Sequence, residues 1–257
     1  MKALVYNGIE TLDHRDAPMP KPALGEELIR IEAVGICGSD MHAYLGHDNR
    51  RPAPLILGHE AAGVIETGTR EGERVAINPL VTNADSIYCR QGRENLCPDR
   101  QIISMPPREG AFAQYLAMPA TNLVTIPDHI SMERAALTEP LAVSWHAARL
   151  GLAALHPASE RKALVIGGGA IGLAAALCLR AQGCESVTIS EPSPARSAFL
   201  ADRCNETVVE APDGEYPLVV DAVGYAATRA TASCVTMPGG VIVHIGLGED
   251  EGGLDIR

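Results

Sequence analysis

A glycine-rich segment directly after an apolar run constrains the fold of this chain more than any other feature. Lys162–Gly167 has the composition of a buried strand, and the segment GGGAIG, Gly167–Gly172, then opens a predicted helix over Ile171–Gln182. The segment matches G-x-G-x-x-G, in which the first glycine allows a tight turn, the second lets backbone approach a pyrophosphate, and the third lets helix and strand pack closely. The helix N-terminus would offer free N–H groups to phosphates. A plain tight turn is the alternative interpretation.

An acidic residue closes the second predicted strand of this half, Ser186–Ser190. Glu191 follows Gly172 by nineteen residues, where a carboxylate is expected to accept hydrogen bonds from an adenosine ribose. Its charge would repel a 2′-phosphate, so the sequence favours NAD over NADP. Arg196 could soften this preference by pairing with a phosphate, or it is a solvated helix charge. The predicted cofactor-binding residues are Gly167, Gly169, Ala170, Ile171, Gly172, Glu191, Arg196 and Val223.

Apolar strands alternate with helical segments throughout the second half, which we assign to residues 142–257. Such alternation predicts a parallel, doubly wound sheet of the Rossmann type. The predicted strands are Lys162–Gly167, Ser186–Ser190, Thr207–Glu210, Pro217–Val223 and Gly240–Gly246, and the predicted helices are Ile171–Gln182 and Pro194–Arg203.

The first half, residues 1–141, has a different pattern of apolar and turn-forming residues. Short β-rich runs are separated by Gly and Pro, which predicts a mostly antiparallel β domain. A helical pattern then runs from Ser131 to about Leu150. The β-rich runs are Lys2–Tyr6, Glu27–Val34, Gly63–Glu66, Arg74–Asn78 and Ala113–Met118.

Composition excludes several classes of function. The formal charge of −11, with no run of Lys or Arg to offset it, argues against a nucleic-acid partner. No stretch reaches the roughly 20 apolar residues that cross a bilayer, and MKALVYNG does not have the pattern of a signal peptide. Seven cysteines at uneven spacing do not form a disulfide framework in a chain of this size, so a cytoplasmic location is predicted.

Three short segments of the first half carry side chains that bind zinc. Cys37 lies in GICGSD, His59 and Glu60 lie in GHE, and Glu139 lies in TEPL. Zinc accepts thiolate, imidazole and carboxylate ligands in a tetrahedral arrangement, and a catalytic site keeps one position for water or substrate. Taken singly, such a cysteine is usually a small core residue and such a histidine a satisfied polar one.

Together, the segments GICGSD, LGHE, EPLAV and GGGAIG resemble the zinc-containing medium-chain dehydrogenases in order and spacing. Within them the chain is most similar to the sorbitol, xylitol and idonate branch. The resemblance covers essentially all 257 residues. It implies a GroES-like β domain beside a Rossmann domain, with zinc in the cleft between them, and a homodimer or homotetramer at full length.

The resemblance also implies a metal site. Cys37 and His59 are its expected direct ligands. Glu60 and Glu139 are expected to be ligands or partners of the zinc-bound water, because members of the family differ in which carboxylate binds directly. Asp40 is expected to orient His59 from outside the ligand set.

A proton relay is implied as well. Ser39 matches the hydroxyl that takes the alcohol proton, and His42 matches the outer end of the relay. A helix N-cap is the alternative for Ser39, and a surface histidine the alternative for His42.

The chain departs from the family at a second metal site. Many relatives bind a structural zinc through four cysteines, and the corresponding positions here are Asn83, Ser86, Cys89 and Cys97. Two thiolates with a neutral amide and a hydroxyl would not hold a metal tightly, since structural zinc sites are closed and four-coordinate. We predict one catalytic zinc per chain, with the structural site empty.

A second departure lies at the end of the chain. The sheet should continue beyond Gly246 with one more strand, and the family's chain then returns to complete the catalytic domain, but here it ends at Arg257 after Gly248–Gly253. We therefore expect the C-terminal part of the fold to be missing, with an open edge at Gly240–Gly246 and low stability of the 257-residue chain alone.

The predicted function is zinc-dependent hydride transfer between the secondary alcohol of a polyol, or a related hydroxy compound, and NAD. One alternative is a zinc-free quinone reductase of the same superfamily, which would not need Cys37, His59 and Glu139. The other is a non-catalytic dinucleotide-binding protein of the same fold, made inactive by the missing C-terminal segment.

Overall fold

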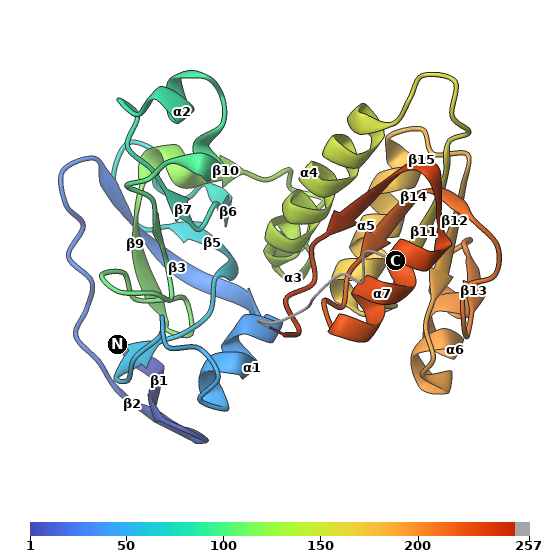
Figure 1. Ribbon diagram of the computed structural model, residues 1–257. Coiled ribbons are helices and arrows are strands. Elements are labelled where there is room, and N and C mark those ends of the chain that lie inside the picture. Colours follow the sequence, from blue (N-terminus) through green and yellow to red (C-terminus); the bar gives the residue numbers. More distant parts are fainter. Residues whose placement is uncertain (250–257) are drawn as a thin grey trace. The chain divides into compact units, whose positions relative to one another are not determined.

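The computed structural model describes residues 1–249, in two compact units (Figure 1). The first unit is Met1–Glu139, and the second begins at Pro140. None of the helices within residues 1–249 combines the length and the apolar composition that a membrane span requires. The acidic segment Gly248–Gly253 lies mostly outside the described residues.

The first unit is built from antiparallel β-sheets. A three-stranded sheet has the order β2-β1-β4, a five-stranded sheet the order β10-β6-β5-β3-β9, and β7 pairs with β8. Five short helical segments join them. The strands are β1 (Lys2–Gly8), β2 (Thr11–Asp16), β3 (Glu26–Gly35), β4 (Leu55–Ile56), β5 (Glu60–Ile65), β6 (Arg74–Ile77), β7 (Leu80–Val81), β8 (Gln101–Ile102), β9 (Tyr115–Pro119) and β10 (Leu123–Thr125), and the helical segments are α1 (Gly38–Tyr44), α2 (Ile87–Arg90), η1 (Glu94–Leu96), η2 (Ala120–Asn122) and α3 (Met132–Ala136).

The core of this unit lies against the five-stranded sheet. Ile29 in β3, Ile65 in β5, Val75 in β6 and Met118 in β9 are almost fully buried and belong to one cluster. Each comes from a different strand and lies on the face of the sheet that is turned to this core. This packing fixes the ends of β3 and β5, where the candidate site residues lie.

The second unit contains a five-stranded sheet in which every pair is parallel, in the order β13-β12-β11-β14-β15. This confirms the predicted doubly wound sheet. The strands are β11 (Lys162–Ile166), β12 (Ser186–Ser190), β13 (Thr207–Val209), β14 (Tyr216–Asp221) and β15 (Thr236–His244), and the helices are α4 (Thr138–Ala154), α5 (Ala170–Ala181), α6 (Pro194–Arg203) and α7 (Ala226–Val235).

Both faces of this sheet are covered, as expected for parallel strands. Val165 in β11 packs in a cluster with Leu179 of α5, whereas its neighbour Leu164 packs in another cluster with Ala232 of α7. Because successive side chains of a strand point to opposite faces, α5 and α7 lie on opposite sides of the sheet. The carboxyl end of β11, where the glycine-rich turn begins, is therefore held from both faces.

The helix predicted over Ser131 to about Leu150 is two helices. Ser131 caps α3, since its Oγ accepts from the Arg134 N–H at 3.4 Å, and α3 ends before Leu137. A new helix, α4, begins at Thr138. This break places Pro140 in the first turn of α4, where a missing N–H costs no intrahelical hydrogen bond.

Candidate metal and dinucleotide sites

Cys37 lies in the connection between β3 and α1. It is the N-cap residue of α1, with φ −80° and ψ 154°. Its backbone N–H donates to Asp40 Oδ2 at 3.0 Å, and its carbonyl accepts from the Asp40 N–H at 3.0 Å. Ser39 therefore lies inside α1 rather than at its cap, so the N-cap alternative for Ser39 is wrong.

His59 and Glu60 lie at the start of β5, opposite the end of β3. Glu60 pairs with Gly35 in the antiparallel register, which brings it alongside the segment that carries Cys37. Gly58, with φ 89°, turns the chain into the strand, and its N–H donates to Asp40 Oδ1 at 3.1 Å. Asp40 thus ties the Cys37 loop to the His59 loop through two backbone N–H groups.

The glycine at position 35 makes room for Glu60. A Cβ at Gly35 would lie 2.2 Å from Glu60 Oε2 and 3.1 Å from Glu60 Cβ. The φ of Gly35 is not in the left-handed region, so its role here is one of space. This role of Gly35 could not be predicted from the sequence, because nothing in the neighbouring residues signals a close approach.

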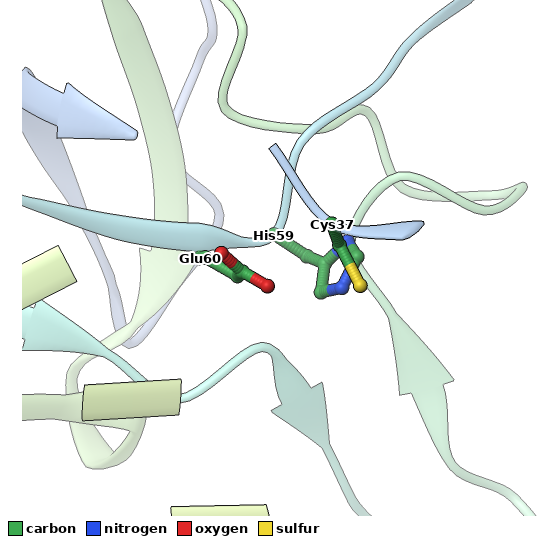
Figure 2. A group of neighbouring side chains, drawn as sticks. All are labelled: Cys37, His59 and Glu60. Carbon is green, nitrogen blue, oxygen red and sulfur yellow. The ribbon is translucent and has the colours of Figure 1, made fainter. Parts of the chain in front are cut away.

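The structure brings Cys37, His59 and Glu60 together. One possible ligand atom from each lies within 4.8 Å of the others, and their side chains point toward one another (Figure 2). His59 and Glu60 are buried and Cys37 is half-buried. A thiolate, an imidazole and a carboxylate in this arrangement fit the ligand chemistry of zinc.

Glu139 does not belong to this group of three in the part of the chain that is described. It is half-buried, and the charges of His59, Glu60 and Asp40 all affect its pKa, so it lies in the same neighbourhood. Burial, the largest influence, raises the pKa of its carboxyl. The pKa of Glu60 is raised for the same reason.

His59 has the largest shift in this cluster. Burial lowers the pKa of its imidazole, but hydrogen bonds to the side chains of Asp40 and Cys37, together with their negative charges, outweigh burial and raise the pKa to about 10. For Asp40, burial is likewise opposed by the hydrogen bond to His59 and those from Cys37 and Gly58, and its pKa is lowered. A metal ion that binds this imidazole must therefore displace a proton.

Ser39 and His42 lie on one face of α1. Both are half-buried, and they are three positions apart, the spacing at which helical side chains are neighbours. The ring of His42 also lies 6.4 Å from the ring of His47. Their roles in a proton relay are taken up as a proposal below.

In the second unit, the glycine-rich turn has the shape that its sequence predicts. Gly167 has φ 94°, and a Cβ there would lie 2.4 Å from Val223 Cγ2. A Cβ at Gly172 would lie 1.8 Å from the Gly167 carbonyl oxygen. Gly169 is the N-cap of α5 and has open space where a side chain would be, which would let a phosphate approach the helix N-terminus.

Glu191 is buried beside this turn, and its carboxylate already has partners. It accepts from the Gly168 N–H at 2.9 Å and the Ser193 N–H at 2.7 Å. Arg196 contacts both carboxylate oxygens, with Nη2 at 2.9 Å from Oε1 and Nε at 2.9 Å from Oε2. Burial raises the pKa of Glu191, but these hydrogen bonds outweigh it and the pKa is lowered. The carboxylate and the guanidinium thus form one unit beside the dinucleotide turn.

The four positions that correspond to a structural zinc site lie between β7 and β8. Asn83 bonds to Asp99 at 3.1 Å, and the Ser86 hydroxyl accepts from the Tyr88 N–H at 3.3 Å as the cap of α2. Cys89 and Cys97 are free thiols, half-buried and buried respectively. The amide and hydroxyl that replace cysteines therefore serve local structure.

Comparison with known proteins places this architecture in a family. The alcohol dehydrogenase GroES-like domain matches residues 23–128. L-galactonate-5-dehydrogenase of Escherichia coli (strain K12) is 33% identical over 270 residues, which cover 98% of this chain and 77% of that protein. The chain belongs to the zinc-containing medium-chain alcohol and polyol dehydrogenases. Sorbitol dehydrogenase of Bacillus subtilis (strain 168) is 39% identical over 208 residues, or 76% of this chain.

Solved structures of similar dehydrogenases share the fold. An alcohol dehydrogenase from E. coli CFT073 complexed with NADH has a TM-score of 0.88 at 26% identity, over 99% of this chain and 79% of that chain. A putative zinc-binding dehydrogenase from Sinorhizobium meliloti 1021 bound to NADP has a TM-score of 0.88 at 25% identity, over 100% of this chain and 79% of that chain.

The chain covers only part of the length of these relatives. Its match to the B. subtilis sorbitol dehydrogenase spans 57% of that protein's length.

Proposed function

We propose that this chain carries the metal and dinucleotide sites of a zinc- and NAD-dependent dehydrogenase that oxidises a secondary alcohol of a polyol or a related hydroxy compound. This proposal rests on the observation that possible ligand atoms of Cys37, His59 and Glu60 lie within 4.8 Å of one another. A glycine-rich turn suited to a dinucleotide supports it, as do the sorbitol and L-galactonate dehydrogenases among its relatives.

Cys37 and His59 are the proposed direct ligands, and Glu60 is the nearer of two candidate carboxylates. Glu139 is the other, either as a ligand or as a partner of bound water. When bound, zinc supplies Lewis-acid polarisation of the substrate hydroxyl, which lowers the pKa of that hydroxyl. The carboxylates of buried Glu60 and half-buried Glu139 would disfavour an anionic substrate and suit a neutral one rich in hydroxyl groups.

Ser39 is the proposed acceptor of the hydroxyl proton, and His42 is the proposed outlet of that proton. Their three-residue spacing on α1, at which helical side chains are neighbours, supports a relay between them. The residues of the glycine turn would hold the pyrophosphate by backbone N–H groups, and Glu191 would accept hydrogen bonds from the adenosine ribose. A cytoplasmic location and a homodimer or homotetramer remain predictions.

Replacement of the metal cysteine tests the proposal. Purified wild-type chain should bind one zinc and reduce NAD with at least one compound in a panel of polyols and sugar acids. Cys37→Ser should lose both zinc and turnover while its circular dichroism spectrum stays unchanged. Cys234→Ser, which changes an exposed thiol in α7, is the matched control and should keep both.

The test also separates the alternatives. NAD binding without zinc and without turnover on any substrate of the panel would favour a non-catalytic dinucleotide-binding protein. Quinone reduction that survives in Cys37→Ser would favour the zinc-free branch.

A further inference from the structure

Ser104 is a buried residue in an unusual backbone conformation beside the candidate metal site. Its side chain is inaccessible to solvent, and its φ of 65° lies in the left-handed region. Residues other than glycine rarely adopt this conformation, and it is concentrated at functional sites where the surrounding structure enforces it. Neither the metal site nor the dinucleotide site described above includes Ser104.

The Ser104 hydroxyl contacts His59 directly. Its Oγ lies 3.4 Å from His59 Nδ1, whereas Asp40 Oδ1 lies 3.7 Å from the same nitrogen. The Asp40 carboxylate can only accept a hydrogen bond, so it favours the imidazole tautomer with its hydrogen on Nδ1. The Ser104 hydroxyl then accepts a hydrogen bond from the same N–H. A neutral imidazole with its hydrogen on Nδ1 keeps the lone pair of Nε2 for a metal ion.

A buried ion pair holds the backbone of Ser104. Arg51 Nε donates to the Ser104 carbonyl at 3.0 Å, and Arg51 Nη1 pairs with Asp48 Oδ2. The side chains of Arg51 and Asp48 are only 3% and 6% exposed. A planar guanidinium fixed by a buried carboxylate holds its Nε–H in one direction, and this N–H donates to the carbonyl of the residue that contacts His59.

We propose that Ser104 is a positioning residue for His59, and that the Arg51–Asp48 pair holds Ser104 in its left-handed conformation. This inference rests on the proposed metal site. Ser104 orients the ring, whose tautomer is set by the Asp40 carboxylate, and it does not touch the metal. Partners of this kind typically change metal affinity by about 10- to 100-fold when they are removed.

Two substitutions at one position separate orientation from backbone strain. Ser104→Ala removes the hydroxyl and keeps a Cβ at positive φ. Ser104→Gly removes the hydroxyl and also relieves the backbone, so it should fold at least as stably as Ser104→Ala. We expect both variants to bind Zn²⁺ and Co²⁺ about 10- to 100-fold more weakly than wild type in competition with a chelator. Ser233→Ala, which removes an exposed hydroxyl of α7, should bind both metals as wild type does.

The visible spectrum of Co²⁺-loaded protein gives a second readout, because its bands report the geometry around the metal. We expect the bands to shift in both Ser104 variants and in Arg51→Lys, which keeps the charge but loses the planar donor. Wild-type metal affinity and spectrum in Ser104→Gly would overturn the inference and leave the proposed function standing. Failure of the wild-type chain to bind either metal would overturn both.

Discussion

Gly35 determines how close Glu60 can lie to Cys37 and His59. A Cβ at this position would meet Glu60 Oε2 at 2.2 Å, so Gly35→Ala must push the carboxylate away. The displaced atom is the end of a flexible side chain, so the stability cost should be below about 1.5 kcal/mol. Zinc affinity should fall roughly 10-fold or more if Glu60 is a ligand, as measured by chelator competition. Unchanged affinity would assign the carboxylate role to Glu139.

Glu191 is the residue on which we expect cofactor preference to depend. Removing its carboxylate would delete the proposed ribose acceptor and a charge that would repel a 2′-phosphate, and it would leave Arg196 without this partner. We expect Glu191→Ser to narrow the ratio of NAD to NADP affinity by about 10-fold or more, since a charge-assisted contact is worth roughly 1.5–3 kcal/mol. Fluorescence titration with NADH and NADPH measures the ratio. A wild-type chain that already prefers NADPH would contradict the assignment.

Asp48 makes a pH-dependent contribution to stability. Hydrogen bonds from Arg50, together with the charges of Arg50 and Arg51, lower the pKa of Asp48 from 3.8 to about 2. A lowered pKa stabilises the fold above the unfolded value of 3.8, and this stabilisation is lost as the pH falls toward 2. Asp48→Asn should cost roughly 2 kcal/mol at pH 6, and the difference should shrink between pH 4 and pH 2. Urea unfolding of both proteins across this range measures it, and a pH-independent difference would exclude the ion pair as the cause.

The sequence predicted the residues that form the candidate sites better than it predicted the residues that hold them in place. Cys37, His59 and Glu60 could be predicted because their residue types bind metal ions and their sequence segments resemble those of a known family. Ser104 and Gly35 act through a backbone angle and a missing side chain, and both effects depend on strands that pair far apart in the sequence. Such pairings are not visible in a local pattern.

At the scale of elements, the turn between β11 and α5 leaves no room for a side chain at Gly172. A Cβ at Gly172 would lie 1.8 Å from the Gly167 carbonyl oxygen and 2.9 Å from its carbon, and neither atom can move without distorting the turn. Gly172→Ala should therefore destabilise the second unit by about 2 kcal/mol or more and abolish NADH binding. Thermal unfolding and NADH titration measure the two effects. Gly169→Ala, with nothing within 4 Å of the new Cβ, is the matched control and should leave stability nearly unchanged.

The elements that the sequence predicted well are those with strong apolar periodicity. The bounds of β12 and α6 match the prediction, and those of β11 and α5 differ from it by one residue. The prediction missed α7, because AATRATASCV contains two threonines and a valine that lower helix propensity. It also missed β2, in which every residue is exposed, so no alternation of apolar and polar side chains marks the strand. Both elements are stabilised by tertiary contacts with neighbouring strands rather than by their own composition.

At the scale of the whole molecule, the number of zinc ions per chain separates the two possible metal sites. In residues 1–249 the group of three or more metal-binding side chains is that of Cys37, His59 and Glu60, and the segment between β7 and β8 has the thiols of Cys89 and Cys97 with a capping serine and an asparagine bonded to Asp99 in place of two further cysteines. Among the described residues these two thiols belong to no such group, and two thiolates alone do not make a closed tetrahedral site. We therefore expect elemental analysis of the dialysed protein to find one zinc per chain. The double variant Cys89→Ser/Cys97→Ser should keep that zinc, whereas Cys37→Ser should lose it. Two tightly bound zinc ions in the wild type, one of them lost in the double variant, would show that the pair of thiols recruits ligands that the static structure does not bring together.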